Sequence, residues 1–235
     1  MSATPLDRHV EHALGFADLV VRLSERSTSR STSVSTSTSA PTSTSVSTAA
    51  APAAAAAVTG PSGPRVVEAA PTILDLGSGG GIPGLVLAER FPDSRVLLVE
   101  GSTRRAGWLQ AVTADLDVRS HVEVVGERAE LAAHRPALRG SCSYVIARSF
   151  GRPATTAECG AGFLEVGGWM VVSEPPTPAE VEMERWPAAA VRQLGLGPAE
   201  PVESRGFHYV VLPCVERCPD RYPRRVGIPD KRPLF

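Results

Sequence analysis

The stretch ILDLGSGGGIPG, residues 73–84, decides the fold. Its first residues are aliphatic apart from Asp75, as in a buried strand, and five glycines follow within eight positions. Glycine lets a chain turn tightly and brings its backbone close to a ligand. A plain turn without a ligand is the alternative, but so many glycines weaken the flanking elements unless something must approach them. We therefore predict a ligand-binding turn between a strand and a helix.

The sequence on the carboxyl side of this turn alternates between short β-branched runs and helical patterns. Such alternation is typical of a parallel sheet with helices on both faces. The expected strands are 72–76, 95–100, 121–125, 144–147, 169–173 and 207–212, and the expected helices are 82–90 and 103–115.

The sequence on the amino side falls into two segments. Apolar residues recur near helical spacing in the first and predict an amphipathic helix over residues 7–26. In the second, residues 27–48 contain 17 Ser or Thr among 22, and Ala and Pro follow. Such a segment has little apolar surface to bury, so we expect a flexible linker. The predicted organisation is an N-terminal region over 1–26, a disordered linker over 27–64 and an α/β domain over 65–235.

Composition excludes several classes of protein. Four cysteines in 235 residues are too sparse for a disulfide framework and fit a reducing compartment. The longest apolar run, residues 49–57, is short, contains Pro52 and lacks a basic flank, so it fits neither a membrane span nor an export signal. A cytoplasmic protein is the expectation.

Two ligand classes compete for the glycine turn. Residues 79–84 satisfy G-x-G-x-x-G, the pattern of dinucleotide-binding turns. Asp75 adds the pattern D-x-G-x-G-x-G, which resembles the first motif of class I methyltransferases that bind S-adenosylmethionine (AdoMet). Glu100, at the end of the next strand, suits the ribose hydroxyls of either cofactor. Asp75 and the compact glycine run favour AdoMet.

The whole string over residues 75–109 strongly resembles the RsmG (GidB) family, bacterial enzymes that methylate N7 of a guanine in 16S ribosomal RNA. Further segments are similar to that family: Pro83-Gly84, RAEL at 128–131, ARSF at 147–150, the tail RYPRRVGIPDKRPL at 221–234, and DRHVEHAL at 7–14 with His9. The resemblance implies a Rossmann-like class I methyltransferase fold, with a mostly parallel seven-stranded sheet, and AdoMet as cofactor.

The resemblance also implies the cofactor site. The family's AdoMet contacts fall on Gly77, Ile82, Ala129, Glu130 and Arg148 of this chain. Together with the motif residues, the expected cofactor-binding set is Asp75, Gly77, Gly79, Ile82, Glu100, Ala129, Glu130 and Arg148. We assign no catalytic residue, because guanine N7 carries a lone pair and no proton, and positioning it against the methyl group should dominate the rate.

The carboxyl-terminal segment, residues 217–235, suggests contact with nucleic acid. It holds six basic and two acidic residues, a charge of +4, whereas the rest of the chain carries −5 and the whole −1. Basic side chains beside Tyr222 suit phosphate contact and base stacking, although they could equally pack against the sheet edge. The expected RNA-binding residues are Arg221, Arg224, Arg225, Lys231 and Arg232. The expected partner is 16S rRNA or the small ribosomal subunit, bound by a monomer.

We expect no metal site. Cys214 and Cys218 have no second ligand pair in the sequence.

The chain departs from the family in three places. The segment before His9 is short, a linker is inserted, and Ser173-Glu174-Pro175-Pro176 stands where the family has a Lys-Gly pair. These departures motivate an alternative function, a non-catalytic relative that binds AdoMet or RNA without turnover.

Overall fold

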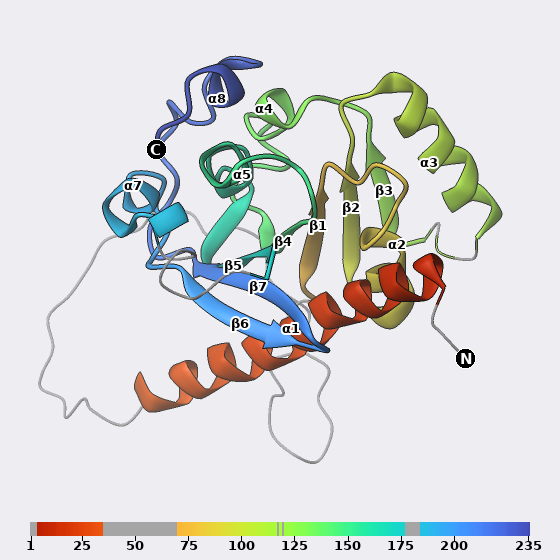
Figure 1. Ribbon diagram of the computed structural model, residues 1–235, viewed down its shortest axis with the longest axis horizontal. Coiled ribbons are helices and arrows are strands. Elements are labelled where there is room, and N and C mark those ends of the chain that lie inside the picture. Colours follow the sequence, from red (N-terminus) through yellow and green to blue (C-terminus); the bar gives the residue numbers. More distant parts are fainter. Residues whose placement is uncertain (1–3, 35–69, 117, 119, 177–183) are drawn as a thin grey trace, which may run out of the picture.

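A computed structural model describes residues 4–34, 70–116, 118, 120–176 and 184–235. Its centre is a seven-stranded sheet in the order β3-β2-β1-β4-β5-β7-β6 (Figure 1). The strands are β1 Thr72–Leu76, β2 Arg95–Val99, β3 Val122–Val125, β4 Cys142–Ala147, β5 Leu164–Glu174, β6 Glu200–Ser204 and β7 Phe207–Pro213. The first five strands are parallel, and β7 pairs antiparallel with both β5 and β6. The predicted Rossmann-like, mostly parallel seven-stranded sheet is confirmed.

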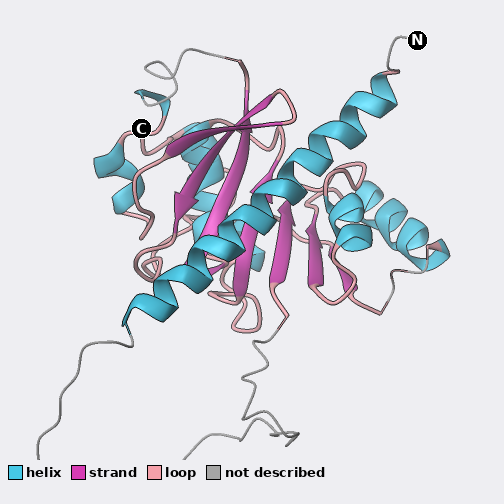
Figure 2. Ribbon diagram, turned by 90° about the horizontal axis from the view of Figure 1, so that it is seen from below, coloured by secondary structure: helices cyan, strands magenta, loops and turns pink. Residues whose placement is uncertain are grey.

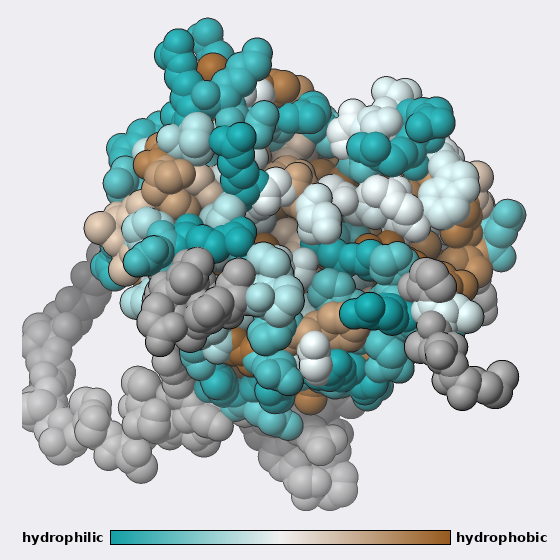
Figure 3. Space-filling model, in the orientation of Figure 1, coloured by the Kyte–Doolittle hydropathy of each residue, from teal (hydrophilic) through white to brown (hydrophobic). Residues whose placement is uncertain are grey.

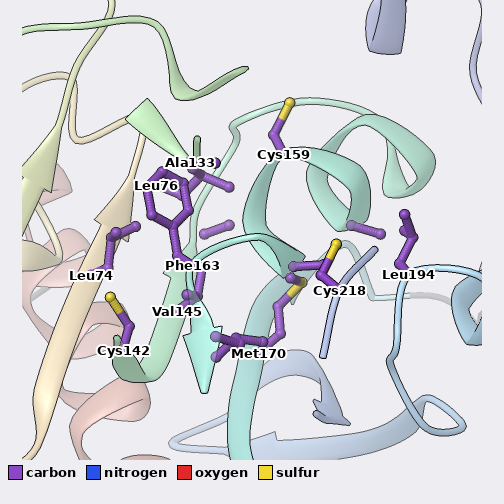
Figure 4. Close-up of a cluster of buried hydrophobic side chains, with 14 of the residues drawn as sticks. Leu74, Leu76, Ala133, Cys142, Val145, Cys159, Phe163, Met170, Leu194 and Cys218 are labelled. Atoms are coloured by element: carbon purple, nitrogen blue, oxygen red, sulfur yellow. The ribbon is translucent and has the colours of Figure 1, made fainter. Parts of the chain in front are cut away.

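Helices cover both faces of this sheet. They are α1 Pro5–Val34, α2 Gly84–Arg90, α3 Thr103–Asp115, α4 Ala129–Ala132, α5 Pro153–Ala161, α7 Ala188–Arg192 and α8 Ile228–Lys231. Strand residues alternate between two cores, as the pleat requires. Ile73 and Leu98 face the core under α1 and α2, whereas Leu74 and Val145 face the core under α4, α5 and α7 (Figure 4).

Helix α1 crosses the sheet diagonally on the first of these faces (Figure 2). Phe16, Val20 and Leu23, at helical spacing, are almost completely buried against it. A glycine is required at position 15, because a Cβ there would lie 2.1 Å from Tyr209 Oη. The Tyr209 hydroxyl donates a hydrogen bond to the carbonyl of His12 at 2.8 Å, which joins α1 to β7.

The boundaries of α1 differ from the expectation. The helix continues to Val34, eight residues into the segment predicted as linker, while residues 35–64 of that segment lie outside the described residues. Ser24 Oγ and Ser27 Oγ, near the expected end of the helix, donate to carbonyls one turn earlier. Ser27 Oγ also accepts from Trp169 Nε1 at 3.4 Å, which joins this part of α1 to β5.

The remaining differences concern short elements. Helices α4, α5, α7 and α8 and strand β6 were not expected, and β5 is longer than its expected core. All four cysteines are buried and free. Within the described residues, no helix is long and apolar enough to span a membrane.

Candidate cofactor site

The glycine turn lies where the sheet order reverses, between the carboxyl ends of β1 and β4. Gly77, Gly79 and Gly81 have φ angles of 74°, 55° and 84°, which side chains rarely adopt. The amides of Gly77 and Ser78 both donate to the carbonyl of Val99, at 2.9 and 3.0 Å. The turn is thereby fixed to the end of β2 and presents bare backbone to the crevice.

Glu100 follows β2 and is held in its ionised form. Its carboxylate accepts from Gly79 N at 3.0 Å, Ser102 N at 2.7 Å and Arg105 Nη2 at 2.9 Å. Burial opposes ionisation, but the hydrogen bonds from Arg105, Ser102 and Gly79 outweigh it and lower the pKa of this carboxyl below its ordinary value. A carboxylate has about four acceptor positions. Accepting both hydroxyls of a ribose therefore requires the half-exposed Arg105 to move aside.

Asp75 lies beneath the turn and does not line the crevice. Its side chain is 1% exposed, and Oδ2 accepts from Gly84 N at 3.0 Å. Burial raises the pKa of Asp75 to about 7. A Cβ on Gly84 would lie 2.7 Å from the same oxygen, so only glycine allows this contact. Asp75 shapes the turn, and the structure gives no support to the expected direct contact with cofactor.

Glu130, at the start of α4, connects the crevice to the tail. It is buried, accepts from Arg128 Nη2 at 2.8 Å and accepts from Gly227 N at 3.0 Å. Burial opposes its ionisation, but these donors lower the pKa of Glu130. It is therefore no solvated surface carboxylate. Ala129 beside it presents only a methyl group to the crevice.

Arg148 follows β4 and leaves one donor atom unused. Its Nη2 lies 2.9 Å from Nδ1 of His9 in α1, whereas Nη1 is buried and has no hydrogen-bond partner in the described part of the chain. Buried donors are normally paired. Ser149, the next residue, has a φ of 54°, and the ring of Phe150 packs against Gly77. This arrangement places in the lining of the crevice a guanidinium with one unpaired nitrogen.

These residues enclose a cavity of about 520 Å³. The cavity is lined by Gly77, Ser78, Gly79, Gly80, Ile82, Val99, Glu100, Gly101, Ser102, Arg105, Arg128, Ala129, Glu130, Arg148, Ser149 and Phe150. Seven of the eight expected cofactor residues are thus brought together, and only Asp75 is not among them. Arg105, Arg128 and Phe150 also line the cavity and were not among the expected site residues, although all three lie in segments that resemble the family. No group of potential metal ligands occurs among the described residues.

The residues of the basic tail fall into two groups, those that pack against the domain and those that are exposed. Arg224 donates to the fully buried Glu158, with Nη2 to Oε2 at 2.7 Å, so its guanidinium anchors the tail. Tyr222 is buried under the Arg221 guanidinium, whose carbon lies 5.0 Å from the ring centre, and this corrects the expectation that Tyr222 stacks on exposed bases. Arg221, Arg225, Lys231 and Arg232 are exposed. The surface over α8 is mainly hydrophilic, at the top of Figure 3.

Solved structures share this architecture. An antibiotic-resistance methyltransferase, Kmr, aligns with a TM-score of 0.51 at 13% identity, covering 63% of this chain and 87% of that one. A 16S rRNA (adenine(1408)-N(1))-methyltransferase from Catenulisporales acidiphilia aligns with a TM-score of 0.52 at 14% identity, covering 64% and 88%. At such identities the likeness shows the fold alone. The chain thus has the Rossmann-like fold of class I methyltransferases.

Sequence comparison narrows the class to a family. The family model described as rRNA small subunit methyltransferase G matches residues 63–184. Ribosomal RNA small subunit methyltransferase G of Dehalococcoides mccartyi (strain CBDB1) is 37% identical over 169 residues, covering 69% of this chain and 71% of the relative. The protein of that name from Roseiflexus castenholzii is 38% identical over 170 residues, covering 69% and 70%. The chain belongs to the rRNA small subunit methyltransferase G family, a family of AdoMet-dependent enzymes.

Proposed function

We propose that this protein transfers the methyl group of AdoMet to N7 of a guanine in 16S ribosomal RNA. The observation that carries the proposal is the convergence of seven expected cofactor residues on one cavity in a chain of this family. The family placement decides against the nicotinamide dinucleotide alternative, and nothing in the comparisons favours a relative without turnover.

The residues of the cavity fit AdoMet. Bound AdoMet supplies a methyl group activated by its sulfonium centre. Glu100, ionised and at the end of β2, would accept the ribose hydroxyls. Arg148, which lines the cavity, would pair with the carboxylate of the methionine part. Ala129 would flank the adenine, and the bare turn at Gly77 and Gly79 would let the ligand lie close to the backbone.

The chain needs no general base for this reaction. Guanine N7 attacks with its own lone pair and has no proton to lose. The protein's part is to position N7 against the methyl carbon, and orientation of this kind supplies much of the barrier reduction in such reactions. Arg148, Ser149 and Phe150, which form one wall of the cavity, accordingly provide orientation and no general base.

The exposed tail residues Arg221, Arg225, Lys231 and Arg232 are proposed to contact rRNA phosphates. We further propose a monomer in the cytoplasm, a reducing compartment that fits the four free cysteines.

Calorimetry with AdoMet tests the cofactor assignment. Glu100→Gln should weaken AdoMet binding about 10-fold or more, since the ribose loses a charged acceptor. Glu123→Gln serves as the matched control, because Glu123 is half-exposed on β3 and lies outside the cavity. Equal affinities of the wild type and Glu100→Gln would refute the assignment of this cavity to AdoMet.

A further inference from the structure

A second cavity adjoins the cofactor cavity. It measures about 390 Å³, within the usual range for ligand pockets, and it shares Ser149 and Phe150 with the first. Its other wall comes from the end of β5, where Glu174 is the last residue, and from Arg185 and Trp186 beyond it. Since β4 and β5 are parallel, Arg148 and Glu174 lie at the same edge of the sheet.

Ring-containing side chains form part of the lining of this cavity. They are Phe150, Pro153, Pro175 and Trp186, and His12 contributes its ring from α1. Burial, with Arg148 and His9 nearby, lowers the pKa of His12 to about 4, so the imidazole is neutral at physiological pH. Its ring stacks on Phe207 with 4.6 Å between the centroids. Such surroundings suit a flat, uncharged ring system such as an extruded nucleobase.

Glu174 contributes a buried carboxylate to this cavity. Its side chain is 3% exposed, and Oε1 accepts from Trp186 Nε1 at 3.0 Å. Oε2 forms an ion pair with Arg185 Nη2 at 3.0 Å but accepts no hydrogen bond of good geometry within the described residues. Burying a carboxylate is costly unless its acceptor positions are used.

From this geometry we propose that the second cavity receives the target guanine and that Glu174 selects it through its Watson–Crick edge. This inference rests on the proposed function and assigns a specificity-determining residue to it. Guanine presents two adjacent donors on that edge, N1–H and the N2 amino group, which match the two oxygens of a carboxylate. Adenine and cytosine present a ring acceptor beside their amino group, and uracil presents one donor between two acceptors.

The same orientation places the reacting atom correctly. N7 belongs to the Hoogsteen edge of guanine and not to the edge that Glu174 would bind. It is therefore free to face the wall formed by Ser149 and Phe150, behind which the cofactor cavity begins. Trp186 and Arg185 act as positioning residues, since they hold the carboxylate in place.

The test compares guanosine with inosine at the methylated position. Inosine keeps N7 and N1–H but lacks the N2 amino group. Small subunits are reconstituted with guanosine or inosine at the methylated position, and kcat/KM is measured with labelled AdoMet. The wild type should prefer guanosine by about 10-fold or more, as for other paired base edges. Glu174→Gln, which keeps an acceptor for Trp186 but places a donor against the base, should lose most of this preference. Its AdoMet affinity should equal that of the wild type.

Glu165→Gln is the matched control, because Glu165 is an exposed carboxylate on the same strand, outside both cavities. An unchanged preference in Glu174→Gln would overturn the proposal while leaving the proposed function intact. If the wild type methylates neither subunit, the proposed function fails instead. Titration with GMP and IMP, followed by NMR, then decides: tighter binding of GMP that depends on Glu174 supports the guanine site, and equal binding of both nucleotides overturns it.

Discussion

Three buried carboxyl groups have different partners in this fold: Asp75, Glu100 and Glu158. Hydrogen bonds keep Glu100 ionised at the crevice, and an ion pair with Arg224 holds Glu158 in the core. Asp75 lies 3.0 Å from one backbone amide and has no neighbouring cation in hydrogen-bond contact. At the scale of the residue, these environments predict which carboxyl groups make stability depend on pH.

Asp75 should destabilise the fold as pH rises. Its pKa is about 7 in the folded chain, against an ordinary value of 3.8, so the folded state holds a proton that the unfolded state releases. Stability should therefore fall between about pH 4 and pH 7 and level off above. Asp75→Asn keeps an acceptor for Gly84 and should remove roughly 1–3 kcal/mol of this decline. Urea unfolding at several pH values measures it, and identical pH profiles would contradict the assigned burial cost.

Arg224 should contribute strongly to the stability of the fold, whereas its exposed neighbour Arg225 should not. Arg224→Ala leaves Glu158 buried without its partner and should cost about 3–5 kcal/mol of unfolding free energy. Arg225→Ala changes an exposed neighbour and should leave stability within about 0.5 kcal/mol. Chemical unfolding of both variants provides the measurement. A stable Arg224→Ala protein would show that this arginine is not the tail's anchor.

At the scale of the element, α1 is an integral part of the domain. It packs its apolar face on the sheet and brings His9 to Arg148 at the edge of the cofactor cavity. The spacing of apolar residues predicts this helix, but Ser27 and Arg26 near its carboxyl end contact Trp169 and Glu200, which are distant in the sequence. Local sequence contains no signal for such contacts.

Removing the central contact of α1 should weaken the whole fold. Phe16 is completely buried, so Phe16→Ala should lower the unfolding free energy by about 3–5 kcal/mol. Val21→Ala, on the exposed side of the same helix, should cost under about 0.5 kcal/mol. Urea denaturation monitored by circular dichroism compares them. Similar midpoints for the two variants would mean that α1 contributes little to stability.

The sequence predicts the parallel half of the sheet better than the rest. Strands β1 and β2 and helix α3 have regular patterns of adequate length and lie where expected. Helices α4, α7 and α8 have four or five residues, too few for a periodic pattern, and β6 contains Glu and Pro, which disfavour strands. In the site, motif residues could be predicted, whereas the ion pair of Arg105 with Glu100 depends on side-chain geometry that the sequence does not specify. The contact of Glu158 with Arg224, outside the site, joins residues that are distant in the sequence.

At the scale of the whole molecule, charge is unevenly distributed. The tail carries +4 and the remainder −5, so RNA binding should depend on the exposed tail cations and on salt. Replacing Arg221, Arg225, Lys231 and Arg232 together by Gln should make the slope of log K against log salt shallower by about 3, if each neutralises one phosphate. Filter binding to small subunits at several salt concentrations measures the slope. An unchanged slope would place the RNA contacts elsewhere on the surface.

Methylation of N7 of a guanine in 16S rRNA is the activity that we propose for this protein. The most direct measurement is mapping of 7-methylguanosine in 16S rRNA, by chemical cleavage and primer extension, in a strain that lacks the gene. We predict that the modification is absent from this strain, that the wild-type chain restores it, and that Glu100→Gln restores it poorly. Persistence of 7-methylguanosine at every position of the 16S rRNA in the deletion strain would contradict the account.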